Sequence, residues 1–348
     1  MRLIRTFLLL CAVLLLTACS KPPVVQESYV FGTRVELLML GAPEATAREA
    51  GNDVLREFDR LHRTYHAWQP SELTALNSAF AASRTVPVSK EMAALITEAQ
   101  DIARQSNALF DPGIGALIKL WGFHADEFIP RLPDESSVNG WKISRPSILD
   151  IHIKDGFASS SKRMVALDFG GYLKGVALDR AADILRRHGI HHALINIGGN
   201  VLALGNRAGK PDGDPWRVGI RAPRGTGVLA SVLLYDGEAI GTSGDYQRFF
   251  EIGGKRYCHL LDPRTGYPVE HTAALTILMP PGPKAGMWSD AASKPLFVAG
   301  PAGWRKEADK LGITQVLRVD ADGSLEATRA MASRLRFEGE APAIRLVD

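Results

Sequence analysis

Residues 164–200 read MVALDFGGYLKGVALDRAADILRRHGIHHALINIGGN, and this stretch decides the fold class. Its first residues, 164–169, have the apolar content of a strand and are followed by a Gly-Gly turn. A helix is predicted from about Gly175 to His188, because a glycine suited to a C-cap follows. A second strand is predicted over 191–197 and ends at a further Gly-Gly pair. The stretch therefore predicts short strands joined to a helix by glycine turns.

Strands and helices are also mixed along the rest of the chain. Apolar residues at helical spacing predict helices over 44–65 and from Ser89, a good N-cap, to about Ser106. Alternation predicts strands over 29–37, 216–220, 228–235, 247–252 and 274–279. This mixture favours an α+β fold with a mixed, largely antiparallel sheet core and flanking helices. A doubly wound nucleotide-binding fold is not expected, because no strand leads into G-x-G-x-x-G.

The first residues indicate export. Arg2 and Arg5 precede an apolar run, which is followed by Thr17-Ala18-Cys19, and this order predicts a lipoprotein signal peptide over 1–18. The run is too short for a helix across a hydrocarbon core of roughly 30 Å. Cys19 is the predicted lipidated N-terminus, 19–28 a lipidated tether and 29–348 one folded domain.

A lipid anchor of this kind places the domain on the periplasmic side of a Gram-negative envelope. Ser20, where Asp would favour the inner membrane, favours the outer membrane. The formal net charge of +3 becomes +1 when Arg2 and Arg5 leave with the signal, so no nucleic-acid partner is expected. Cys258 is then the only free thiol, and the domain has no intrachain disulfide.

Four segments combine glycines with polar side chains: 168–175, 198–200, 242–246 and 259–266. In the first, Asp168 and Lys174 lie on either side of two glycines, whose backbone amides can approach a phosphate closely. Taken singly, the first three segments are also consistent with ordinary turns. The fourth sets an imidazole, a carboxylate and a guanidinium within a few residues, and these groups suit proton transfer and phosphate recognition.

Together with two further segments, these motifs resemble the ApbE family, the FAD:protein FMN transferases. The resemblance covers nearly all of the mature chain in family order, and identifies 29–348 as an ApbE-like FAD-binding transferase domain. Its motifs are Phe31-Gly32-Thr33, Ser71-Glu72-Leu73 with Asn77, Phe110-Asp111 with Trp121-Gly122-Phe123, Asp168 to Gly175, Ser243-Gly244-Asp245-Tyr246, and His259 to Gly266.

The resemblance implies Mg²⁺-dependent cleavage of the FAD diphosphate. FMN would be attached through a phosphoester to a Ser or Thr of another exported protein that carries a flavinylation motif, and AMP would be released. Phosphoryl transfer is mostly positioning and charge neutralisation, so glycine amides, basic residues and a metal ion are suitable parts. The expected partners are FAD, the acceptor protein and, through the lipid anchor, a membrane.

The resemblance also implies residue roles. FAD contacts are expected from Phe31, Tyr65, Trp68, Phe110, Asp111, Asp168, Lys174, Ser243, Asp245 and Leu260. Metal contacts are expected from Gly171, Leu173, Asp290 and the pair Ser293-Lys294. His259 is our choice for the general base on the acceptor hydroxyl, and the alternative is a structural hydrogen bond to the following turn. A nucleophilic Cys258 is disfavoured, because adjacent strand residues point to opposite faces.

The chain departs from the family at its metal motif. The family motif is Asp-x-x-x-Thr, whereas residues 290–294 read DAASK, so Lys294 replaces a hydroxyl ligand. Magnesium prefers oxygen ligands. Either the Lys294 ammonium takes the place of the ion as a point cation, or the lysine side chain points away and the Ser293 hydroxyl is the ligand of the ion instead. Pro295 disfavours helix at Lys294.

This departure leaves three functions open. The first is an active FMN transferase, the second is an FAD-binding lipoprotein without transfer, and the third is a hydrolase that splits FAD to FMN and AMP.

Overall fold

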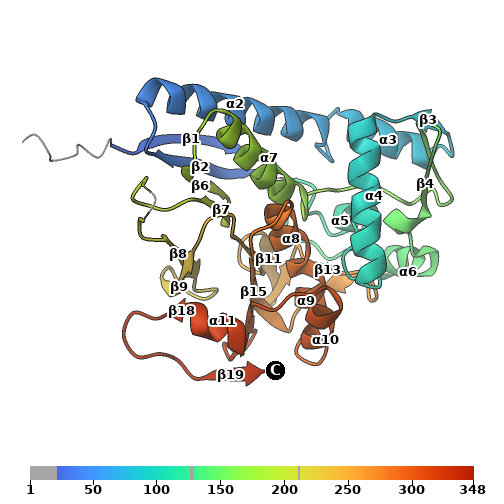
Figure 1. Cartoon of the computed structure of the whole chain (residues 1–348). Helices are drawn as coiled ribbons and strands as arrows, with labels where there is room; N and C mark the ends of the chain where they lie inside the picture. Colours follow the sequence, from blue (N-terminus) through green and yellow to red (C-terminus); the bar gives the residue numbers. More distant parts are fainter. Residues whose placement is uncertain (1–21, 126–128, 211) are drawn as a thin grey trace, which may run out of the picture.

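The computed structural model describes residues 22–125, 129–210 and 212–348, and a nine-stranded sheet forms the centre of this part of the chain (Figure 1). In spatial order its strands are β1 (Val24–Val30), β2 (Thr33–Leu40), β6 (His192–Ile197), β7 (Asn200–Leu204), β10 (Ala239–Gly244), β15 (Thr272–Met279), β16 (Val316–Asp320), β17 (Leu325–Thr328) and β19 (Ile344–Val347). Neighbours are antiparallel except β17 and β19, which are parallel. The predicted α+β fold with a mixed, largely antiparallel sheet is confirmed. The predicted signal segment and Cys19 lie outside the described residues.

Helices cover one face of this sheet. They are α2 (Glu44–Thr64), α7 (Leu173–Arg187), α8 (Ala285–Ala291) and α9 (Ser293–Ala299). Figure 1 shows α2 along the edge of the sheet above β1 and β2, with α7 beside it and α8 further down. The opposite face packs against a second sheet, β18 (Leu335–Arg336), β9 (Val228–Leu234) and β8 (Trp216–Arg221).

Strand β7 lies between these two layers, and its sequence explains why. Leu202 and Leu204 belong to the apolar cluster under the helices, whereas Val201 and Ala203 belong to the cluster under β8 and β9. Because successive side chains of a strand point to opposite faces, a strand buried on both faces must be apolar at every such position.

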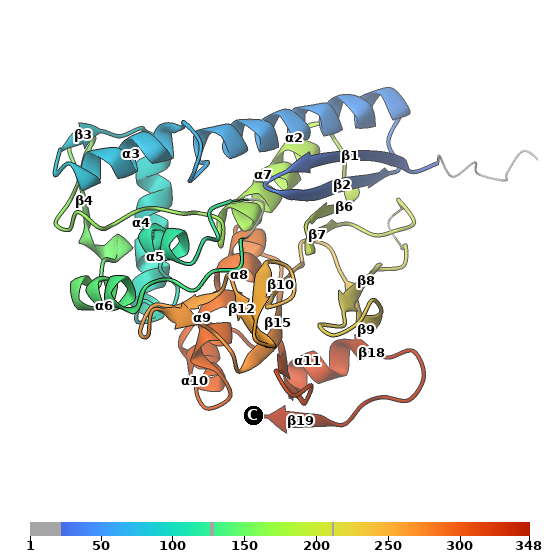
Figure 2. The ribbon, with the colours of Figure 1, turned by 180° about the vertical axis from the view of Figure 1, so that it is seen from behind.

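The remaining elements lie around these layers, and α11 packs beside β16, β17 and β19. The helices are α3 (Glu72–Ala81), α4 (Lys90–Gln105), α5 (Gly115–Leu120), α6 (Glu135–Ser144), α10 (Trp304–Lys310) and α11 (Arg329–Arg334), with a 3-10 turn η1 (Ile148–Asp150). The short strands are β3 (Val86–Pro87), β4 (Ile151–Lys154), β5 (Phe157–Ser160), β11 (Phe249–Ile252), β12 (Lys255–Cys258), β13 (Leu261–Asp262) and β14 (Tyr267–Pro268). Figure 2 shows α3, α4, α5 and α6 grouped at one end of the molecule.

Several predicted elements agree with this structure. The helices α2 and α4 match their predicted ranges, and Ser89 caps α4 by accepting a hydrogen bond from the Met92 N–H. The strands β6, β8, β9 and β15 also lie where they were predicted. Among the described residues, no helix combines the length and apolar character needed to cross a membrane.

Three local predictions were wrong. The strand expected over 29–37 is a hairpin, because Phe31 and Gly32 both have positive φ, +56° and +68°, as a two-residue type I′ turn requires. The sheet also begins at Val24, inside the segment expected to be a tether. Residues 164–169 form no regular strand and make only an isolated bridge between Ile114 and Ala166.

Lys294 was not expected in a helix, yet it lies in the first turn of α9. A proline near a helix start lacks only an N–H that has no partner within the helix, so Pro295 is tolerated there.

Candidate functional site

The glycine turn at 168–175 is held in place by segments that are distant in sequence. Asn77 of α3 pairs with both backbone groups of Leu167: its Nδ2 donates to the Leu167 carbonyl at 2.9 Å, and its Oδ1 accepts from the Leu167 N–H at 2.7 Å. The next amide, Asp168 N–H, donates to the Pro112 carbonyl at 2.8 Å. Three of the motifs that resemble the ApbE family therefore meet at this point.

A fourth motif joins them through Trp121. Its indole Nε1 donates to the Gly266 carbonyl at 2.8 Å, which ties the Trp-Gly-Phe segment to the turn after His259. Asp262 shapes that turn, because its carboxylate accepts from the Arg264 backbone N–H at 2.8 Å and from the Arg264 guanidinium at 2.7 Å.

The glycine turn leads directly into the N-terminus of α7. Asp168 Oδ1 accepts the Gly170 N–H at 2.7 Å, and Lys174 Nζ donates to the Gly170 carbonyl at 3.4 Å. Burial raises the pKa of Asp168, and the Gly170 N–H and the positive charges of Arg248 and Lys174 oppose that rise. The first turn of α7 contains no acidic residue, so its N–H groups and dipole favour an anion.

Helix α8 crosses α7 at Gly175 with almost no space between them. A Cβ on Gly175 would lie 2.4 Å from the Gly286 carbonyl oxygen and 2.8 Å from the Asp290 Cβ. The Asp290 Oδ2 accepts the Gly175 N–H at 3.0 Å. The carboxylate at the end of α8 is thereby fixed beside the first turn of α7.

Lys294 forms an ion pair with Asp290. Its ammonium contacts Oδ1 and also donates to the Asp290 carbonyl at 2.8 Å. The Asp290 side chain is fully buried and that of Lys294 is 16% exposed. Burial opposes ionisation of Asp290, but the charges of Lys294 and Lys174 lower its pKa overall. Burial lowers the pKa of Lys294, and Asp290 opposes that effect.

The two serines expected beside this pair are hydrogen-bonded to each other. Ser293 Oγ donates to the Asp290 carbonyl at 2.7 Å and lies 2.7 Å from Ser243 Oγ. Both side chains are buried. Ser293 could ligate an ion only if both hydrogen bonds rearranged, so the geometry favours Lys294 over Ser293 as the group facing a ligand.

His259 lies at the base of the β11–β12 hairpin. Its Nδ1 is 3.1 Å from the Arg248 carbonyl, which can only accept, so Nδ1 carries the proton and Nε2 presents its lone pair. Burial and the charge of Arg248 lower the pKa of His259 to about 3, and Lys174 and Lys294 add to the effect. The imidazole is therefore neutral and can accept a proton, and it lies within electrostatic reach of Lys174 and Lys294.

Two of the aromatic residues that were predicted to contact FAD, Phe31 and Trp68, pack against histidine rings. Phe31 projects from the hairpin turn, 6.0 Å from the ring of Phe58 and 5.8 Å from the ring of His62. His62 in turn lies 5.0 Å from His66, whose Nδ1 accepts the N–H groups of Trp68 and Gln69. Trp68 stands edge-on to His124 at 5.6 Å. A row of rings thus runs from Phe31 through His62 to His66.

The structure places five other predicted FAD contacts in structural roles. Phe110 and Tyr65 are buried in the main apolar cluster, and Leu260 is buried in the cluster under α9 and α10. The Asp111 carboxylate accepts the N–H groups of Gly113 and Ile148, both at 2.8 Å. Asp245 makes two 2.6 Å bonds to Arg224. Direct FAD contact by these five residues remains a prediction.

Sequence reasoning missed Asp179, Arg224 and Arg248. Asp179 accepts backbone N–H groups of α8, Arg224 pairs with Asp245, and Arg248 provides the carbonyl that orients His259. Of these three residues, only Asp179 could have been found from the sequence, because it follows Gly175 by one helical turn on the face of α7 that must pack. Cys258 is buried and burial raises its pKa to about 12, which agrees with its exclusion as a nucleophile.

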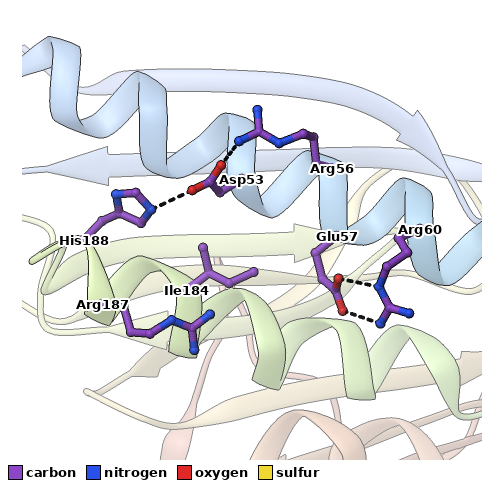
Figure 3. A pocket seen from close by; sticks show the side chains of 7 residues that line it. All are labelled: Asp53, Arg56, Glu57, Arg60, Ile184, Arg187 and His188. Atoms are coloured by element: carbon purple, nitrogen blue, oxygen red, sulfur yellow. Dashed lines mark hydrogen bonds and ion pairs between the residues drawn. The ribbon is translucent and has the colours of Figure 1, made fainter. Parts of the chain in front are cut away.

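The hollow in Figure 3 belongs to a different place. It has a volume of about 350 Å³ and lies between α2 and the C-terminal end of α7, away from Lys174. Two pairs of its polar side chains contact each other: His188 with Asp53 at 2.8 Å, and Arg60 with Glu57 at 2.8 Å.

Within the described residues, no group of three or more His, Cys, Asp and Glu side chains is arranged to hold a metal ion. The ammonium at Asp290 Oδ1 and the Gly175 N–H at Oδ2 occupy the oxygens that such an ion would need. The residues present therefore do not fit a divalent cation at Asp290.

Known proteins are similar to this chain in sequence and in fold. The sequence model of the ApbE family matches residues 31–317. The FAD:protein FMN transferase of Rhodobacter capsulatus is 40% identical over 94% of this chain, which spans 61% of the length of that relative. The FAD:protein FMN transferase of Haemophilus influenzae is 27% identical over 92% of this chain and 94% of its own.

Solved structures of proteins named ApbE have the same fold as this chain. The ApbE protein of Thermotoga maritima superposes with a TM-score of 0.81 and 28% identity, over 91% of this chain and 100% of its own. The apo form of the flavinyl transferase ApbE of Pseudomonas stutzeri superposes with a TM-score of 0.78 and 25% identity, over 92% of this chain and 98% of its own. From its sequence match and its architecture, this chain belongs to the ApbE family.

Proposed function

We propose that this chain is an FAD:protein FMN transferase, which passes the FMN part of FAD to a Ser or Thr hydroxyl of another exported protein. The observation that carries the proposal is the convergence of the glycine turn, two lysines and the neutral His259 at the N-terminus of α7. The names of the relatives from Rhodobacter capsulatus and Haemophilus influenzae support the same reaction.

The chain's own residues would bind the FAD diphosphate. The Gly170 and Gly175 N–H groups are taken by Asp168 and Asp290, so the Gly171 amide would be the backbone donor, and Lys174 and Lys294 would supply positive charge. The row of rings that begins at Phe31 would flank the flavin, because an aromatic face suits a flat conjugated ring. Asp168 fixes the turn through Gly170.

The transfer step follows from these positions. The acceptor hydroxyl oxygen attacks the phosphorus on the FMN side of the diphosphate and forms a phosphoester bond. The bond from that phosphorus to the bridging oxygen breaks, and the bridging oxygen leaves with AMP. His259 Nε2 takes the hydroxyl proton. No part of this step is assigned to Mg²⁺, because the residues at Asp290 do not fit the ion.

A second candidate is FAD binding without transfer, and the Lys294–Asp290 ion pair favours it, because a single ammonium neutralises less charge than a divalent ion. One assay separates the candidates. Purified protein is incubated with FAD and an acceptor that bears Asp-x-x-Ser/Thr-Gly-Ala-Ser/Thr. We expect covalent flavin on the acceptor and free AMP. Bound, unchanged FAD would select the second candidate, and free FMN without labelled acceptor would select a hydrolase.

The chain's export and anchoring are also part of the proposal. Cleavage after residue 18 would leave Cys19 as an acylated N-terminus on the periplasmic side of the outer membrane. The segment before Val24 would link the anchor to the sheet. Cells grown with a labelled fatty acid should incorporate label into the wild-type protein but not into Cys19→Ala. Unlabelled wild-type protein in the soluble periplasmic fraction would contradict the anchor.

A further inference from the structure

The ion pair between Lys294 and Asp290 has the geometry of a built-in cation. The Lys294 ammonium has three N–H donors. Two are used by Asp290, at its Oδ1 and at its carbonyl oxygen. The third has no partner among the described residues, so it remains available to a ligand.

The position of this ammonium matches that of the proposed diphosphate site. A Cβ on Gly171 would lie 3.3 Å from Lys294 Cε, so the lysine side chain runs against the glycine turn. Asp290, which holds the ammonium, is itself bonded to the Gly175 N–H in the first turn of α7. Lys174 acts on the same pair through its charge. The ammonium therefore lies between the Asp290 carboxylate and the turn whose amides would face the phosphates.

A divalent ion would compete with this arrangement rather than add to it. It would need Asp290 Oδ1, which the ammonium already contacts. A doubly charged ion about 4 Å from an ammonium is repelled by several kcal/mol even at an effective dielectric constant near 20. The lysine would have to leave its buried position, and its charge would then have to be hydrated elsewhere.

We propose that the Lys294 ammonium is this chain's own cation for the FAD diphosphate, so that FAD binds without a divalent metal ion. The inference rests on the proposed function and adds the source of the positive charge. It predicts that the affinity for FAD is the same with chelator and with Mg²⁺, and that it depends on the charge at position 294.

The test is an FAD titration of the folded domain by flavin fluorescence, in EDTA and in Mg²⁺, for the wild type and three variants. The wild-type dissociation constant should agree within about twofold in the two buffers. Lys294→Met, which keeps the chain length but loses the charge, should bind about tenfold to hundredfold more weakly in both. Lys294→Arg should retain most of the affinity. Lys310→Met is the matched control: among the described residues Lys310 on α10 pairs only with Glu307, and its loss should leave binding unchanged.

Lys294→Thr gives an independent readout. It restores a hydroxyl at that position, so it should bind FAD weakly in EDTA and regain affinity in Mg²⁺ or Mn²⁺. Mn²⁺ electron paramagnetic resonance should show bound ion in this variant with FAD but not in the wild type. The proposal is overturned if Mg²⁺ tightens wild-type binding tenfold or more, or if Lys294→Met binds like the wild type. If the folded wild type binds no FAD in either buffer, the proposed function itself fails.

Discussion

Asp179 on α7 and Asp290 on α8 bind each other's helix: each carboxylate accepts backbone N–H groups from the opposite element. Asp179 accepts from Gly286 and Met287, both at 2.8 Å, and Asp290 accepts from Gly175 at 3.0 Å. Helix α8 has no cap from its own N-cap side chain, so Asp179 supplies that cap from the neighbouring helix. These three hydrogen bonds fix the position of Asp290 and Lys294 relative to the glycine turn.

Removing Asp179 should therefore weaken both the fold and the site. In Asp179→Ala two N–H groups at the start of α8 lose their acceptor, and we expect a loss of about 1–3 kcal/mol in the free energy of unfolding. Part of that loss is offset, because burial raises the pKa of Asp179 to about 7 and its charge is costly to bury. Urea denaturation measures the loss of stability, and FAD titration measures the weakening of the site.

Asp183→Ala is the control for this change. Asp183 is exposed on the same helix and lies 3.6 Å from Arg186, a surface pair that contributes little. If the two variants have the same stability and the same affinity for FAD, Asp179 does not hold α8 in place.

The contact between Gly175 and α8 gives a second prediction. In Gly175→Ala the new Cβ would meet backbone atoms of Gly286 and Met287 at 2.4 and 2.7 Å, so the helices must separate. Overpacking of this kind costs about 1–3 kcal/mol, and it should also break the bond from Gly175 to Asp290. Thermal denaturation and FAD titration should both show the loss.

Gly140→Ala tests whether the effect is specific to this crossing. Gly140 lies within α6, and a Cβ there would meet no atom within 4 Å. Alanine favours helix over glycine by about 1 kcal/mol, so this variant should be as stable as the wild type or more stable. A loss of stability as large as that of Gly175→Ala would contradict our account.

Local patterns were enough to predict much of this fold. Helical spacing with a serine N-cap predicted α4, and alternation or apolar runs predicted β6 and β15, because each pattern reports a buried face of one element. The hairpin at Phe31 was missed because only its glycine signals a turn, whereas Phe31 adopts a positive φ that its residue type disfavours.

The site was predictable only where its chemistry lies in continuous motifs. Asp168, Lys174 and His259 are in such motifs, and the structure brings them together. The Asp179 cap and the Arg224–Asp245 pair depend on contacts between distant segments, which one sequence does not reveal. Asp111 also has a role that its motif did not reveal, because its carboxylate accepts the backbone N–H groups of Gly113 and Ile148.

Asn77 should prove as important for the glycine turn as any residue within it. Asn77→Ala removes both partners of the Leu167 backbone, and we expect a loss of about 2–4 kcal/mol with faster amide exchange over 167–171. Ser78→Ala, one residue further along α3, removes only an exposed bond to the Thr74 carbonyl and should change neither quantity. Unchanged exchange in Asn77→Ala would show that the turn holds its shape without this anchor.

His259 predicts a pH dependence with a definite sign. Its pKa is lowered to about 3 in the folded chain, whereas an unfolded histidine titrates near 6.5. Between these values only the unfolded chain binds the proton. The stability that His259 contributes is therefore present above about pH 6.5 and is lost as the pH falls towards 3, by up to about 1.4 kcal/mol per pH unit. Solvent that still reaches the half-buried ring reduces this slope.

His259→Asn isolates the contribution of His259, because its Nδ2 matches the imidazole Nδ1 and can still donate to the Arg248 carbonyl but does not titrate. Urea denaturation between about pH 4.5 and 7.5 should show a steeper loss of stability for the wild type than for this variant. Saturating FAD should narrow that difference, because an anionic diphosphate beside Lys174 and Lys294 raises the pKa of a nearby imidazole. Parallel curves without FAD would mean that His259 is not held neutral. A difference that FAD leaves unchanged would mean that the diphosphate does not bind beside it.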